Sequence, residues 1–188
     1  MDGYHVALFL HFCALISAIA ATSVIHIGTV RRDRARTLAE ALEWHNTAMA
    51  TSKTFPIAVA TLVLSGSYML RGSALWSSGF VVAGLTGVGM LLLLGMVLSI
   101  KGRAMKQRIE QAIRDEGPSQ APTIPRDPVV GILQNIPVGI VLAVMFDMTT
   151  KPSVGSSLGV IGLGVAVGAV VGSLLRPTPV PGKVPQRG

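Results

Sequence analysis

The stretch LFLHFCALISAIAATSVIHIG, from Leu8 to Gly28, decides the class of fold. It contains no Asp, Glu, Lys or Arg, and about 20 apolar residues suffice to cross the ~30 Å hydrocarbon core of a bilayer. No basic segment precedes it, and it is longer than the roughly 7–15 apolar residues of a signal peptide. The sequence therefore predicts a membrane-spanning helix at about residues 4–30, and we expect that helix to remain in the mature protein.

Four further apolar runs lie at residues 51–70, 76–100, 128–148 and 154–175. The second span is the weakest because it contains Lys53, which we expect to extend toward the membrane surface. The 188-residue chain is 13% charged, whereas soluble domains carry about 25% charged residues. We therefore predict an all-α fold, a polytopic transmembrane helix bundle of about five spans. Residues 1–176 form its single domain, and the proline-rich residues 177–188 form a disordered cytoplasmic tail.

The chain has a net charge of +7, and its basic residues are divided unequally between the two sides of the predicted bundle. Of the 16 Lys and Arg residues, only Arg71 and Lys151 fall in the two short loops on one side, and the other 14 fall on the opposite side. Because Lys and Arg are enriched in cytoplasmic loops, we predict an outside N-terminus and a cytoplasmic C-terminus in the inner (plasma) membrane. The basic face is expected to attract anionic lipid and not nucleic acid.

The loop RRDRARTLAEALEWH, residues 31–45, is rich in helix-forming residues. Two arrangements stay open for this segment: it extends the second span, or it lies along the membrane surface. The second long loop, residues 101–116, has a similar helical pattern. Gly117 and Pro118 end it, and the proline-rich stretch up to residue 127 is typical of an extended linker.

The fifth span, VGSSLGVIGLGVAVGAVVGSLL, contains two sets of glycines spaced four residues apart, one of two residues and one of three. Residues four apart lie on one helix face, so we expect these glycines to form a slanted ridge on which a second helix can pack closely. The second helix belongs either to the same bundle or to a second copy or partner protein. The ridge residues are Gly155, Gly159, Gly164, Gly168 and Gly172.

Three histidines are candidate ligands for a b-type haem or another metal, although the spacing indicates no specific metal site. A haem needs one axial imidazole and often a second strong ligand. One site would use His11 with His5 or Met69, and the other would use His26 with His45. The alternative is that His11 hydrogen-bonds a neighbouring helix while His26 and His45 are hydrated at the surface.

Two amides lie within the fourth span, where polar groups must find partners. Gln134 and Asn135 precede Pro137, which frees a backbone carbonyl. They either form interhelical hydrogen bonds or line a path for a polar substrate. Asp147, near the outer end of the same span, is expected to be a solvated charge that could pair with Lys151.

The first hundred residues resemble a known group of sequences. Residues 4–108 contain the first span with its Leu-His pair, a basic loop, and a second span ending in Ser65, Gly66, Tyr68 and Leu70. This pattern is similar to small bacterial predicted integral-membrane proteins of unknown function. The helix plan also resembles copper-resistance D-type proteins and, more distantly, membrane protoporphyrinogen oxidases. The latter resemblance implies that His11 is a haem ligand.

Three functions are consistent with these observations, and no nucleotide-binding, zinc-binding or nucleophile motif adds an enzymatic one. The first is a non-enzymatic membrane scaffold or accessory subunit that binds itself or a partner through the fifth span. The second is a haem-binding redox protein that uses His11. The third is an oligomeric transporter of a small solute, lined by Gln134 and Asn135.

Overall fold

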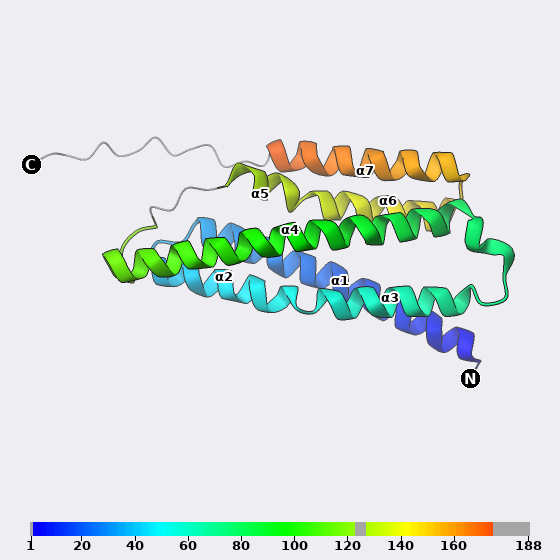
Figure 1. The fold of residues 1–188 in the computed structure, drawn as a ribbon, viewed down its shortest axis with the longest axis horizontal. Coiled ribbons are helices and arrows are strands. Elements are labelled where there is room, and N and C mark those ends of the chain that lie inside the picture. Colours follow the sequence, from blue (N-terminus) through cyan, green and yellow to red (C-terminus); the bar gives the residue numbers. More distant parts are fainter. Residues whose placement is uncertain (1, 123–126, 175–188) are drawn as a thin grey trace, which may run out of the picture.

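The computed structural model describes residues 2–122 and 127–174, and in these ranges every regular element is a helix (Figure 1). The predicted tail, residues 177–188, lies outside the described residues. The elements are α1 (Gly3–Asp33), α2 (Leu38–Ser52), α3 (Phe55–Met69), the short 3₁₀ helix η1 (Ala74–Ser77), α4 (Gly79–Glu116), α5 (Pro128–Leu133), α6 (Ile136–Thr150) and α7 (Val154–Leu174).

Five helical segments of the described chain are long and apolar enough to cross a membrane, which confirms the predicted all-α, five-span fold. They are Gly3–Asp33, Leu38–Met69, Gly79–Glu116, Val129–Thr150 and Val154–Leu174. The second span begins earlier than the predicted residue 51, because α2 and α3 lie end to end (Figure 1). The basic loop therefore extends this span. Large apolar side chains such as Phe9, Leu93 and Leu163 face outward, as expected for contact with lipid.

Two of the five spans are interrupted, each beside a proline. The α2–α3 break, residues 53–54, precedes Pro56, and the α5–α6 break, residues 134–135, precedes Pro137. Proline has no N–H to donate to the carbonyl four residues earlier, so the backbone hydrogen bonding of the helix is interrupted there. Neighbouring polar side chains bond other carbonyls at the breaks: Ser52 Oγ donates to Met49 O (2.8 Å), and Asn135 Nδ2 donates to Gly131 O (2.8 Å).

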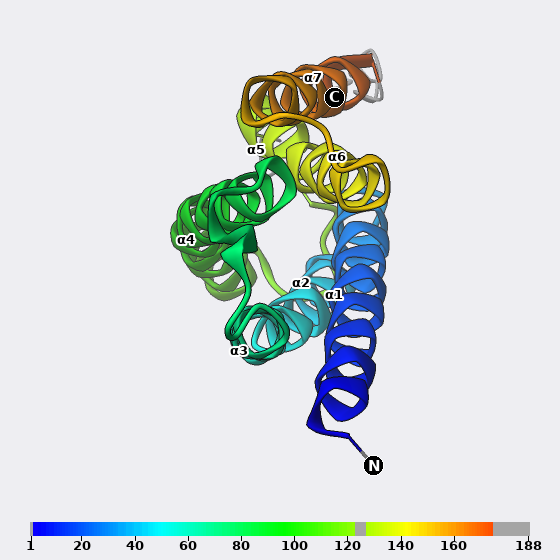
Figure 2. The same ribbon diagram turned by 90° about the vertical axis from the view of Figure 1, so that its right-hand side faces the viewer.

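The helices form two groups. In the first group, α1 packs on both α2 and α3; in the second, α6 packs on α7 and α4, and α5 packs on α7. The groups meet chiefly where α2 packs on α4, whereas α3 makes little or no contact with α4. Viewed along the bundle, the helices are arranged in a ring, with α1 and α4 on opposite sides (Figure 2).

Hydrogen bonds connect the two groups at the end of the bundle where α1 ends and α2 begins. We call this the basic end, because it carries Arg31, Arg32, Arg34 and Arg36. The first two N–H groups of α2 donate to the segment that follows α4: Leu38 N to Gln120 O (2.9 Å) and Ala39 N to Pro118 O (3.1 Å). These bonds satisfy helix-terminal donors that have no partner within α2. The N-terminus lies at the opposite end (Figure 1).

Candidate functional site

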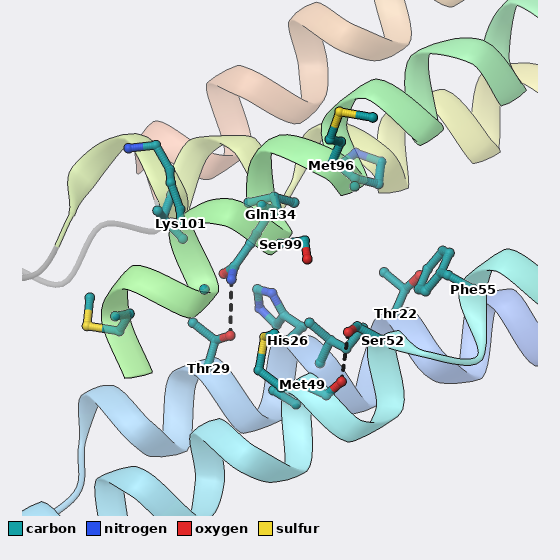
Figure 3. A pocket seen from close by; sticks show the side chains of 18 of the residues that line it. Thr22, His26, Thr29, Met49, Ser52, Phe55, Met96, Ser99, Lys101 and Gln134 are labelled. Atoms are coloured by element: carbon teal, nitrogen blue, oxygen red, sulfur yellow. Dashed lines mark hydrogen bonds between the residues drawn. The ribbon is translucent and has the colours of Figure 1, made fainter. Parts of the chain in front are cut away.

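A cavity of about 470 Å³ lies between the two groups, in the half of the bundle nearest the basic end. Binding sites for small molecules typically have volumes of about 300–1,000 Å³. Its walls come from α1, α2, α3, α4, α5 and α6 and from Asp127 (Figure 3). Both proline breaks contribute, through Ser52 and Pro56 on one side and Gln134 and Pro137 on the other.

The chemistry of the lining changes along the cavity. On α4 the lining runs from Leu91 to Arg108, which corresponds to about 25 Å of helix. Apolar side chains such as Leu91 and Val59 form the deep end, and Lys101 and Arg108 lie at the basic end. Hydrogen-bonding side chains occupy the middle: His26, Thr29, Ser52, Ser99 and Gln134.

Two of the three predicted histidines line this cavity. His26 extends from α1 into the space between the groups (Figure 3). His45 borders the cavity from α2, is only 3% exposed, and has Nδ1 3.4 Å from Arg32 Nη1. A guanidinium can only donate, so Nδ1 accepts and the ring proton is on Nε2. The Gly102 carbonyl lies near the ring, but Nε2 forms no hydrogen bond of normal geometry with any described atom.

The two predicted amides have different positions. Gln134 lines the cavity, and its Nε2 donates to Thr29 Oγ1 (3.1 Å), which links the second group to the first (Figure 3). Asn135 does not line the cavity; its side chain bonds its own helix at the α5–α6 break. Only Gln134 is therefore placed to contact a molecule in the cavity.

The basic end of the cavity has a positive charge. The lining has a net charge of +2 when its histidines are neutral, because it contains three cations, Arg32, Lys101 and Arg108, and one carboxylate, Asp127. Arg32 pairs with Asp33 (2.8 Å) outside the lining, and Lys101 pairs with Asp127 (2.7 Å). The hydrogen bond from Lys101 is the main reason that the pKa of Asp127 is below its usual value. Arg108 forms no ion pair with any residue that the structure describes.

His11 lies elsewhere, between α1 and α3. Its Nδ1 is 3.1 Å from Ser65 Oγ, and that hydroxyl donates to Thr61 O, so Nδ1 is the donor of the histidine–serine bond. A Cβ at Gly66 would lie 3.6 Å from His11 Cε1, which shows how closely α3 covers the ring. His11 lines neither this cavity nor a second one of about 570 Å³ between α1 and the α2–α3 span. His11 therefore packs between α1 and α3 through its bond to Ser65, and its role as a haem ligand stays a prediction.

The usual metal-binding side chains do not cluster among the described residues. No group of three or more His, Cys, Asp or Glu side chains among them could hold a metal ion. His26 and His45 line one cavity without a third ligand of these types.

The five predicted glycines do not share one packed face of α7. A Cβ at Gly164, Gly168 or Gly172 would meet backbone of α5, α6 or the residues between them at 2.4–2.8 Å. Gly155 and Gly159 have open space beside them. The five-residue step from Gly159 to Gly164 turns the helix about 140° beyond one full turn, so the two sets face different directions.

Two polar residues are buried at the ends of α6 and α7 that lie far from the basic end, which the sequence did not predict. Asp147 and Ser157 are both 0% exposed, and neither carboxylate oxygen of Asp147 nor the hydroxyl of Ser157 has a hydrogen-bond partner among the described atoms. The expectation of a solvated charge at Asp147 is wrong, because α6 packs this position against α4 and α7. Lys151 does not pair with it; its ammonium lies 6.0 Å from the centre of the Phe80 ring.

Comparison with known proteins gives no match of this chain to a family model, a curated protein or a solved structure.

Proposed function

We propose that this chain is a membrane transporter of a small solute, with the cavity between the two helix groups as its binding site. The observation that carries the proposal is the position of the two proline breaks, which both border this cavity. In many transporters the substrate site is formed by discontinuous helices, because interrupted backbone offers polar groups at membrane depth.

The arrangement of the groups supports motion around this site. The groups meet chiefly through α2 and α4, and α3 stands away from α4. Farther along the cavity, one hydrogen bond, from Gln134 to Thr29, joins them. Rocking of one group against the other would expose the cavity at alternate ends, as alternating access requires.

Cysteine accessibility tests this function without a known substrate. The only native cysteine, Cys13, is replaced by alanine, and Ser99, which lines the cavity, is replaced by cysteine. In oriented vesicles we expect a membrane-impermeant maleimide to label Ser99→Cys from both sides, because a transporter opens to each. Leu93→Cys, on the same helix but 66% exposed and outside the cavity lining, is the lipid-facing control.

A matched pair of glycines sharpens this test. Gly95 lines the cavity and Gly89 does not, and a Cβ at either would meet nothing within 4 Å. We expect Gly95→Leu to slow labelling of Ser99→Cys at least about tenfold by filling the cavity, and Gly89→Leu to leave it unchanged. Labelling of Ser99→Cys as slow as that of Leu93→Cys would contradict a hydrated cavity, and labelling from one side only would contradict transport.

A membrane scaffold or accessory subunit is the second candidate function. Three exposed glycines on α7 favour it: Gly155, Gly159 and Gly162 all have open space where a second helix could approach. Gly159→Leu should then reduce the mass of the particle purified in mild detergent, as measured by light scattering. An unchanged mass would contradict an interface at this face.

A further inference from the structure

The cavity offers unused hydrogen-bond donors at its basic end. Arg32 and Lys101 already have carboxylate partners, Asp33 and Asp127. Arg108 has no described ion pair, and the Nε2 proton of His45 has no acceptor of normal hydrogen-bond geometry, the Gly102 carbonyl being the nearest group near the ring. His45 is buried, and a buried donor without an acceptor is costly. Arg108 is an exposed side chain at the basic end of the lining, so it is free to bind an anion there. An oxyanion would supply acceptors to both side chains.

The other end of the cavity suits hydrocarbon. Beyond Ser52 and Ser99 the walls are mainly apolar, formed by Phe55, Val59, Leu91 and Leu92. Thr22 also lies at this end, beside Phe55, but its hydroxyl donates to Ala18 O (2.8 Å) within its own helix (Figure 3). An apolar chain buried there gains about 0.8 kcal/mol per CH₂ transferred from water. A solute that is polar throughout would leave these walls without favourable contacts.

The cavity is also open toward lipid along one side. Leu92 and Met96 line it and are 52% and 63% exposed, at the side where α3 and α4 make little or no contact. An apolar chain can therefore enter sideways from the membrane while its polar head stays at the basic end.

We propose that the molecule bound in this cavity is a membrane amphiphile with an oxyanion head and one apolar chain. The head binds Arg108 and His45 at the basic end, and the chain lies along Leu91 and Val59. Asp127 keeps Lys101 occupied, so Arg108 supplies the main charge for the head. This inference rests on the proposed function, because it names the class of solute for the same cavity.

Thermal unfolding of the full chain in dodecyl maltoside tests the class of ligand. Dodecyl phosphate is the probe, and dodecyltrimethylammonium and inorganic phosphate are the comparisons. We expect dodecyl phosphate to raise the Tm and the other two not to, because only the first has both an anionic head and a chain. A ligand that binds only the folded protein stabilises it in proportion to its occupancy.

Variants locate the binding site. Arg108→Gln should increase the half-saturating concentration of dodecyl phosphate about tenfold, the loss expected for one charge-assisted hydrogen bond. Arg103→Gln is the matched control, since Arg103 is an exposed arginine on the same helix that does not line the cavity. Gly95→Leu should abolish the shift, and Gly89→Leu should preserve it.

The outcomes separate this inference from the proposed function. If Ser99→Cys is labelled from both sides but dodecyl phosphate gives no shift, the transporter stands and the ligand class is wrong. An equal shift with the ammonium amphiphile would overturn the requirement for an anion, and a shift with inorganic phosphate alone would overturn the requirement for a chain. A shift that Arg108→Gln and Arg103→Gln reduce equally would place the head outside the cavity.

Discussion

Replacement of Gly168 by leucine is expected to lower the free energy of unfolding by about 3 kcal/mol, enough to prevent assembly of a marginal bundle. A Cβ at this position would lie 2.7 Å from Asn135 O and 2.8 Å from Ile136 Cα. These are backbone atoms, so they cannot rotate away as a flexible side chain can, and α7 must separate from the α5–α6 span. Unfolding in detergent, followed by circular dichroism, measures the loss.

Gly162→Leu provides the control for this prediction. It makes the same substitution in the same helix, at a glycine that has open space on every side within 4 Å. Its effect on stability should stay within about 0.5 kcal/mol. Equal losses for the two variants would show that helix α7 tolerates no leucine at either position and that contact with α5 and α6 is not the cause.

Asp147→Asn is expected to increase the free energy of unfolding by about 2 kcal/mol. The carboxylate of Asp147 is 0% exposed and lacks a described partner, so the fold bears the cost of removing it from water. Asparagine has nearly the same shape and no charge, so it removes most of this cost without creating a cavity. The midpoint of thermal unfolding at constant detergent concentration measures the change.

The control is Asp115→Asn, which removes an exposed charge near the end of α4. Its effect should be within about 0.5 kcal/mol. A loss of stability in Asp147→Asn would refute the prediction and show that the carboxylate forms a favourable interaction, for instance with a bound cation.

The number of spans could be predicted from sequence because lipid imposes a local rule. About 20 apolar residues and no more than a few charges define a span, and residues 8–28 meet that condition without reference to any other segment. The boundaries of the second span were less predictable. The helix-forming residues of the 31–45 loop predicted a helix, but their polarity left open whether it extends the second span or lies along the membrane. In the structure α2 packs on α1 and α4 and lies end to end with α3.

The cavity could not be predicted from sequence, because it depends on contacts between distant segments. His26 and His45 were singled out as a pair, but the approach of His45 to Arg32, and the link from Gln134 to Thr29, arise only when six segments pack together. Asp147 is a different case. The buried positions Ile136, Ile140 and Ala143 recur every three or four residues along α6, and Asp147 continues that series. Helical periodicity could therefore have indicated its burial.

The division of the bundle into two groups has a consequence for biogenesis. Each group is built from contacts between helices close in sequence, such as α1 with α2 and α6 with α7, which form quickly because little chain must be ordered between them. A ribosome delivers α1 to α3 before α4 to α7, and units of this kind fold in the order of synthesis. The bonds from Leu38 and Ala39 to the segment after α4 can form only after α4 has been completed. The cavity can therefore form only after α6 has been inserted, because its walls come from segments of both groups, from α1 to α6.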